Sequence, residues 1–158
     1  MFLSISTLFA AHAPYPTNWK SFQKVNTDLA KIGSLPDCKA DVSGLSPAFQ
    51  ETVKMFCGAK EGGPGRVEIL VNDITEFIER DVSYKDGTTF ILHLVDLKLL
   101  LVTYYESGRI LYATYNEDGT FVKAKKKTGL NPRDCKRCHT FYDNVCSFGQ
   151  CGTHGKFK

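Results

Sequence analysis

The chain has 158 residues, a length that suits one domain with a hydrophobic core. Hydrophobic residues make up 42% of the sequence and aromatic residues 12%, as in ordinary globular proteins. The net charge is only +3, and much of the excess lies in KAKKK (123–127) and HGKFK (154–158). A mild charge of this kind argues against a nucleic-acid-binding protein, in which basic residues gather on one face. We interpret the lysine run as a solvated loop, with a docking patch for an acidic partner as the alternative.

The first residues resemble a secretory leader. FLSISTLFAAHA (2–13) is apolar apart from small hydroxyl residues, and it ends in an A-x-A sequence at Ala11–Ala13. It is too short to span a bilayer as a helix, and it lacks a basic start. We expect residues 1–13 to be a signal peptide, either whole or truncated at its start, with a buried N-terminal element as the alternative. The remainder, 14–158, is then a single exported or periplasmic domain, where cysteines are oxidised or ligated.

Two helices are expected in the N-terminal part. In WKSFQKVNTDLAKI (19–32) the apolar residues recur at steps of three and four, which predicts an amphipathic helix ending at Gly33. A second helix is predicted over 46–58, where Ser46 can cap the first turn and Pro47 fits its first position. Glycines and a proline then interrupt the chain at 61–65.

The middle of the chain predicts a β-sheet. Segments 66–73 and 88–124 are dense in β-branched and aromatic residues, and 73–80 fits one short helix between strands. Three sequences suit hairpin turns because each ends in glycine: KDG (85–87), ESG (106–108) and EDG (117–119). We therefore expect an α+β, mainly β fold: a curved antiparallel sheet of about four or five strands, two N-terminal helices and a C-terminal cysteine-rich segment. A long helix over 90–102 is the alternative, which the β-branched and aromatic flanks disfavour.

The cysteine-rich segment carries the strongest motif. Residues 135–139 read Cys-Lys-Arg-Cys-His, the C-x-x-C-H pattern of c-type haem attachment. Two thiols three residues apart can each form a thioether with one vinyl group of the same haem. The histidine that follows then offers its imidazole to the iron, and histidine is the common proximal ligand. The pattern predicts one covalent haem with His139 as the iron ligand.

Three other uses of these cysteines are compatible with the sequence. A zinc site is one alternative, because a second cysteine pair follows, and its ligands would be Cys135, Cys138, Cys146 and Cys151. A redox dithiol and plain disulfides are the others. If haem takes the first pair, an even number remains, and the simplest local pairing joins Cys38 to Cys57 and Cys146 to Cys151.

Few residues are available as a second iron ligand. Past the expected leader, the sequence offers Met55, His93 and His154. Met55 suits core packing in the second helix, and His154 lies in a polar tail. His93 falls in a predicted strand on the opposite face from Leu92 and Leu94. A structural role as a core or surface histidine is one interpretation, yet it is the best candidate for a distal role. So short a supply favours an open or water-occupied sixth site that binds NO or CO.

The order of segments resembles a known family. The sequences in question are YPTNWKSFQKV, VEILVNDITEFIE, YKDGTTFILHLVD, GRILYATYNEDGTF and CKRCH, in that order. This arrangement looks like the P-460-type cytochromes and their relatives, the cytochromes c′-beta, over roughly residues 15–148. The resemblance implies a single c-type haem on a β-sheet fold, usually in a homodimer, with Cys135 and Cys138 attaching the haem and His139 as its proximal ligand.

The resemblance also bears on activity. Hydroxylamine-oxidising members carry a lysine that cross-links to the porphyrin, in a strand after a turn that KDG would match. That strand contains no lysine before Lys98, which favours the c′-beta side, whose members have an apolar distal pocket and bind NO or CO. Phe77 and Phe90 are expected to line such a pocket, or else to be core. A hydroxylamine- or NO-oxidising enzyme with a cross-linked haem, and a simple electron carrier serving a redox partner protein, are the alternatives.

Overall fold

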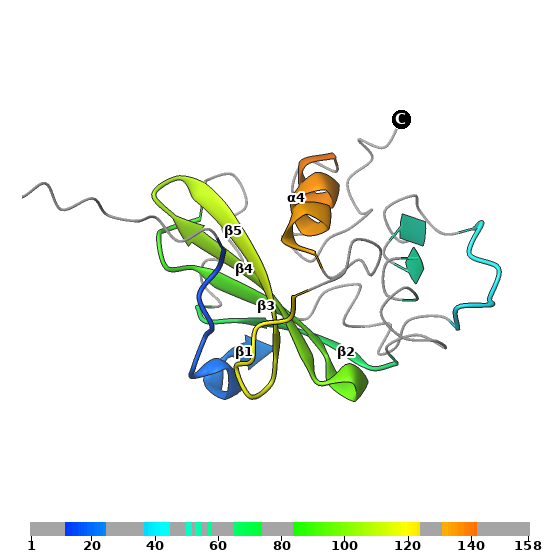
Figure 1. The fold of residues 1–158 in the computed structure, drawn as a ribbon, viewed down its shortest axis with the longest axis horizontal. Helices are drawn as coiled ribbons and strands as arrows, with labels where there is room; N and C mark the ends of the chain where they lie inside the picture. The colour runs from blue at the N-terminus through cyan, green and yellow to red at the C-terminus, as the bar shows by residue number, and fades with distance from the viewer. Residues whose placement is uncertain are drawn as a thin grey trace, which may run out of the picture.

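The computed structural model describes residues 12–24, 37–44, 50–51, 53–54, 57, 65–73, 84–123 and 131–141, apart from the side chains of 138, 140 and 141. Within these residues, five strands form one antiparallel sheet in the order β1-β2-β3-β4-β5 (Figure 1). The strands are β1 (Gln23–Lys24), β2 (Val67–Val71), β3 (Thr89–Leu94), β4 (Leu99–Glu106) and β5 (Arg109–Asn116). The expectation of a mainly β fold with four or five antiparallel strands is therefore confirmed.

Short turns join the last three strands. A 3₁₀ turn, η2 (Val95–Leu97), links β3 to β4 and ends at Lys98 in the left-handed conformation. β4 and β5 are joined by Ser107 and Gly108, both with positive φ (50° and 71°), as a two-residue type I′ hairpin requires. The predicted ESG hairpin is thus confirmed, and the alternative of one long helix over 90–102 is wrong.

The other two glycine turns, KDG and EDG, do not close a hairpin between neighbouring strands of the sheet. Gly87 precedes β3 and its backbone N–H donates to the carbonyl of Tyr105 (2.8 Å), so KDG packs beside β4 instead of closing a hairpin. After β5, the EDG turn reverses the chain, and Phe121 pairs back with Tyr115 in an isolated bridge. The expected hairpin is wrong for KDG, because the chain between β2 and β3 runs through 72–88 before β3 begins.

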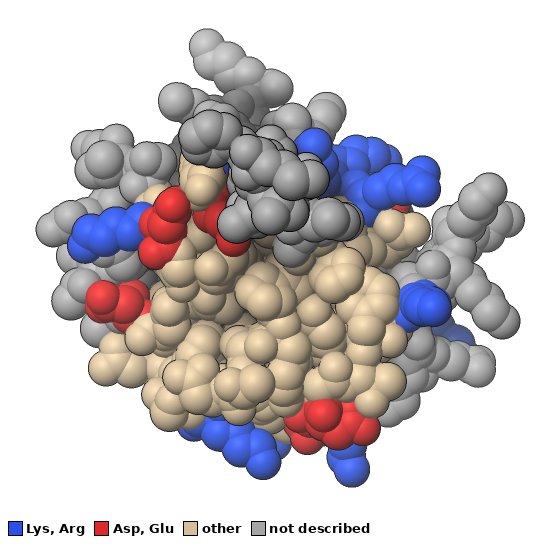
Figure 2. Space-filling view, turned by 60° about the vertical axis from the view of Figure 1, so that its left-hand side comes forward, with Lys and Arg blue, Asp and Glu red and all other residues tan. Residues whose placement is uncertain are grey.

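The two faces of the sheet bury different sets of residues. Alternation along the strands sends Phe90, Leu101 and Tyr105 to one face, where Val53 and Tyr84 pack on them. We call it the α4 face, because helix α4 (Pro132–Phe141) packs on this side of β5. The opposite face, which we call the arm face, is covered by the N-terminal segment 12–24. Its buried residues are Ala13, Trp19, Leu70, Ile91, Leu100, Val102, Leu111, Ala113 and Tyr115. Figure 2 shows a face of the molecule whose coloured part has its charged side chains around the margin. That part of the surface offers no basic track to an anionic polymer.

The predicted helix over 19–32 is wrong in the part that the structure describes. Trp19–Ser21 is a 3₁₀ turn, η1, and the next residues form strand β1 on the edge of β2. The hydroxyl of Tyr115 donates to the Ala13 carbonyl (2.7 Å), and that of Tyr15 donates to the Glu117 carbonyl (2.7 Å). These contacts hold the segment flat on the arm face, so its apolar side chains are buried without a helix. Residues 25–32 lie outside the described part of the chain.

The second predicted helix is seen only in part. Residues 50–51, 53–54 and 57 are α-helical, and Val53 is buried on the α4 face. The pair of N-terminal helices is therefore not confirmed. The predicted disulfide between Cys38 and Cys57 is present. The expected helix over 73–80 lies outside the described residues beyond its first. Among the described helices, none is both long and apolar enough to cross a membrane.

Candidate haem-attachment site

The C-x-x-C-H motif lies on helix α4 (Pro132–Phe141), which packs on β5 (Figure 1). Asn131 begins the helix: its carbonyl accepts from the backbone N–H of Asp134 (2.8 Å), and its side-chain oxygen accepts from that of Arg133 (3.0 Å). Pro132 follows at the first helical position, where its missing N–H costs nothing. Sequence reasoning did not predict this helix, although an asparagine followed by a proline and an aspartate is a start signal.

The helix brings the three motif residues to one side. Positions i, i+3 and i+4 of an α-helix are neighbours on its surface, and these positions are held by Cys135, Cys138 and His139. Cys135 is buried (8% exposed), and its sulfur is not part of the Cys38–Cys57 disulfide. The side chain of Cys138 lies outside the described part of the chain. The motif therefore has the spacing on a helix that a two-sulfur attachment needs.

The cationic residues of α4 project to the other side of the helix. Arg133, Lys136 and Arg137 are exposed, and they also stand at i, i+3 and i+4. Arg137 forms an ion pair with Glu51 of the N-terminal helical segment, with 2.9 Å between Nη2 and Oε1. The helix is thus amphipathic, and this contact ties its outer face to the segment bearing Cys57.

His139 lies against the sheet. Its ring centroid is 5.1 Å from that of Tyr112 of β5, with 45° between the ring planes. Burial lowers the pKa of His139 from 6.5 to about 4, because an imidazolium loses its hydration there. The ring is therefore neutral at neutral pH, and only a neutral imidazole has a nitrogen lone pair available to a metal.

The sheet separates the two histidines that the sequence singled out. Tyr112 stands in one cross-strand row with Thr103 and Phe90, all on the α4 face. His93 alternates with its strand neighbours and projects to the arm face, where Trp19 packs edge-on against it (5.0 Å between centroids). His93 and His139 therefore do not meet.

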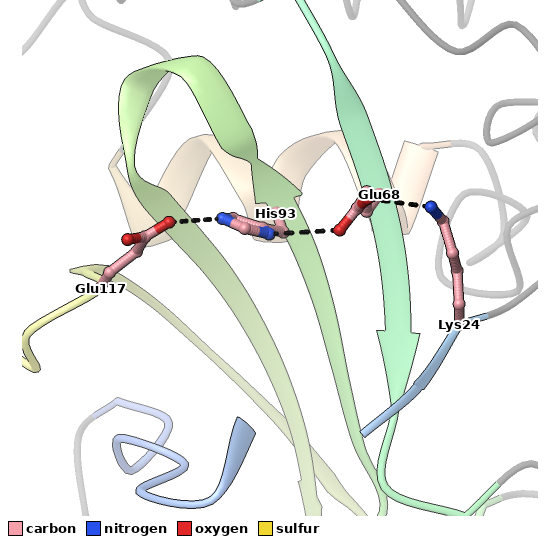
Figure 3. A network of polar contacts seen from close by, with 4 residues as sticks. All are labelled: Lys24, Glu68, His93 and Glu117. Atoms are coloured by element: carbon pink, nitrogen blue, oxygen red, sulfur yellow. Dashed lines mark hydrogen bonds and ion pairs between the residues drawn. The ribbon is translucent and has the colours of Figure 1, made fainter. Parts of the chain in front are cut away.

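Carboxylates enclose His93 on the arm face, and Figure 3 shows it between them. Its Nε2 donates to Oε1 of Glu117 (2.8 Å), and its Nδ1 lies 3.6 Å from Oε2 of Glu68. Lys24 of β1 donates to the same Glu68 (2.9 Å), and this hydrogen bond holds the pKa of the Glu68 carboxyl below its usual range. His93 is only 6% exposed. These surroundings suit a core histidine with structural partners, which is the first of the two interpretations of His93 offered by the sequence.

The remaining predicted site residues have different positions. Phe90 is on the α4 face with His139, buried in an aromatic cluster with Tyr84 (4.8 Å between ring centroids) and Tyr105 (6.2 Å). Lys98 is exposed in the β3–β4 turn, next to Leu99, which pairs with Asn116 at the far end of β5. Tyr112 is four residues from Asn116, about 13 Å along a strand. Other predicted residues lie outside the described chain, namely Met55, Phe77, Cys146, Cys151 and His154, so the zinc alternative and the second disulfide stay predictions.

Comparison with known proteins found no similarity: no family model, no curated protein and no solved structure matches the chain.

Proposed function

We propose that the chain is an exported mono-haem cytochrome. Cys135 and Cys138 attach one haem through thioether bonds, and His139 is the proximal ligand of its iron. The observation that carries this proposal is helix α4, which places positions 135, 138 and 139 on one side, with Cys135 buried and the pKa of the partly buried His139 lowered to about 4. A free-standing surface helix would offer the same sequence spacing without the desolvation that lowers this pKa.

The chemistry of these donors fits the group. Each cysteine supplies a sulfur for one vinyl addition, and the covalent link keeps the cofactor attached whatever the oxidation state of its metal. His139 supplies a nitrogen lone pair, and the sheet behind it excludes water from that side. When bound, the haem supplies an iron that can exchange an electron or take up a small ligand. The protein would hold the haem, orient the imidazole that binds its iron, and shield that side from water.

We infer that the sixth position of the iron is open to a small neutral ligand such as NO or CO. His93 lies across the sheet from His139 and is engaged with two carboxylates, so the electron carrier that uses it as a second ligand loses its best donor. Lys98 stands at the far end of the sheet, which disfavours a lysine cross-linked haem and hydroxylamine oxidation. The aromatic cluster around Phe90 gives the same face of the sheet an apolar character suited to an uncharged ligand. A redox partner protein and a homodimer belong to the proposal through the family resemblance alone.

The test is to express the chain in an export-competent host with haem-attachment machinery. We expect a red protein with one haem that acid–acetone extraction does not remove, and a pyridine haemochrome spectrum of a haem with both vinyl groups saturated. Cys135→Ser should change that spectrum by one vinyl group. The double variant Cys38→Ser/Cys57→Ser is the control: it removes the disulfide outside α4, leaves no new free thiol, and should leave the spectrum unaltered even though it destabilises the fold. A colourless wild-type protein would overturn the proposal.

Binding of CO tests whether the sixth position of the iron is open. Adding CO to the reduced protein should shift the Soret band, because the gas occupies a position that no side chain holds. A spectrum that CO leaves unchanged would refute ligand binding and leave electron transfer as the function.

A further inference from the structure

Tyr112 is a residue of the sheet whose ring packs against the ring of His139. It lies within β5, is 7% exposed, and its centroid is 5.1 Å from that of the imidazole. No motif in the sequence singles it out, because it is one of 7 tyrosines and stands 27 residues before the histidine.

The position of Tyr112 is fixed by the sheet. β5 pairs with β4 over its whole length, with Tyr112 opposite Thr103. The backbone that carries this ring is therefore held in place by β4, on the strand against which α4 packs.

His139, in contrast, is not fully oriented by its own helix. The helix backbone restricts the first side-chain torsion, but the torsion that turns an imidazole about its Cβ–Cγ bond is broad. The groups that the ring packs against therefore help to decide where its nitrogens point. The ring of Tyr112, tilted by 45° to the imidazole, is one such group on the sheet side.

We propose that Tyr112 is a positioning residue for the iron ligand: its ring fixes the rotation of the His139 imidazole and thereby the direction of the nitrogen that binds iron. The inference rests on the proposed function, in which His139 is the proximal ligand. Residues that orient a ligand from behind affect how strongly it binds its metal, even though they never touch the metal.

The test compares three variants of the haem-loaded protein. Tyr112→Phe keeps the ring, Tyr112→Leu removes it, and Tyr115→Leu is the matched control. Tyr115 is equally buried (5% exposed) on the same strand, but it projects to the arm face. The readout is the iron–histidine stretching band in the resonance Raman spectrum of the reduced protein, measured beside the melting temperature.

We expect both leucine variants to melt at lower temperature, because each loses a buried ring. Only Tyr112→Leu should shift and broaden the iron–histidine band, and Tyr112→Phe should match the wild type. An unchanged band in Tyr112→Leu, or an equal shift in Tyr115→Leu, would overturn the inference. If Tyr112→Leu does not fold, Tyr112→Trp takes its place, because a larger ring at this position should turn the imidazole: a displaced band supports the inference, and an unchanged band refutes it. Failure of the proposed function looks different, since the wild type would then carry no covalent haem.

Discussion

Replacing His93 by leucine should destabilise the protein and leave the absorption spectrum of the proposed haem unchanged. His93 lies on the arm face under Trp19, and the sheet separates it from His139. Leucine fills much of the same space, so the main loss is polar. A ligand role would give the opposite pattern, a changed spectrum with little change in stability.

The magnitude follows from two contacts. The 2.8 Å hydrogen bond from Nε2 of His93 to the Glu117 carboxylate involves a charged acceptor, and losing such a bond costs about 1.5–3 kcal/mol. The 3.6 Å contact with Glu68 adds at most about 1 kcal/mol, because that side chain is 25% exposed and water screens it. We expect a loss of about 2–3 kcal/mol, which lowers the melting temperature of a chain of this size by about 5–10 °C.

The assay is urea denaturation followed by circular dichroism and by the fluorescence of Trp19, the single tryptophan, recorded beside the absorption spectrum of the reduced and oxidised protein. His93→Gln is the matched control, since its amide can donate to Glu117 and should recover part of the stability. The reasoning is refuted if His93→Leu alters the Soret or visible bands, or if its unfolding midpoint equals that of the wild type.

Three further predictions concern stability. The Lys24 hydrogen bond lowers the pKa of Glu68, so its stabilisation is present above the unfolded value of 4.5 and is lost as the pH falls through the lower folded value. Between about pH 5 and pH 3, the melting temperature of Glu68→Gln should therefore fall less than that of the wild type. Equal falls in the two melting temperatures would contradict this. Gly119→Ala should cost about 1–3 kcal/mol in chemical denaturation, because φ is +91° and the new Cβ would lie 3.0 Å from the Tyr15 ring; a neutral effect would show that the turn relaxes freely. Opening the disulfide with Cys57→Ser should cost about 3 kcal/mol, since its sulfur closes a loop with a sequence separation of 19, and an unchanged unfolding midpoint would show that this link adds nothing.

Local sequence signals predicted the features that depend on neighbours in the chain. The density of β-branched and aromatic residues predicted strands over 88–124, and the ESG sequence predicted the hairpin between β4 and β5, because a two-residue positive-φ turn is a local requirement. The turn between β3 and β4 at Val95–Leu97 was not predicted. The Cys38–Cys57 disulfide followed from counting and proximity. The motif at 135–139 predicts its own chemistry, since the spacing of two thiols and an imidazole is a property of five consecutive residues.

Features that depend on distant parts of the chain were missed or remained open. The spacing of Trp19 and Phe22 suits a helix, but it suits equally well a turn and a strand that lie on an apolar sheet face. The arm face, built from residues 67–115, made that choice. Helix propensity is a weak preference that tertiary contacts override.

The sequence by itself therefore predicted a haem-attachment motif and determined the tight hairpin between β4 and β5. Only the tertiary structure decided on which face of the sheet each histidine lies. Alternation sets His93 opposite to its own strand neighbours, but it cannot say which face α4 will cover. That depends on the register of four strands and on the return of a helix from residue 131 to β5. Burial in this arrangement then lowers the pKa of His139, and contacts of such long range leave no periodic trace in the sequence.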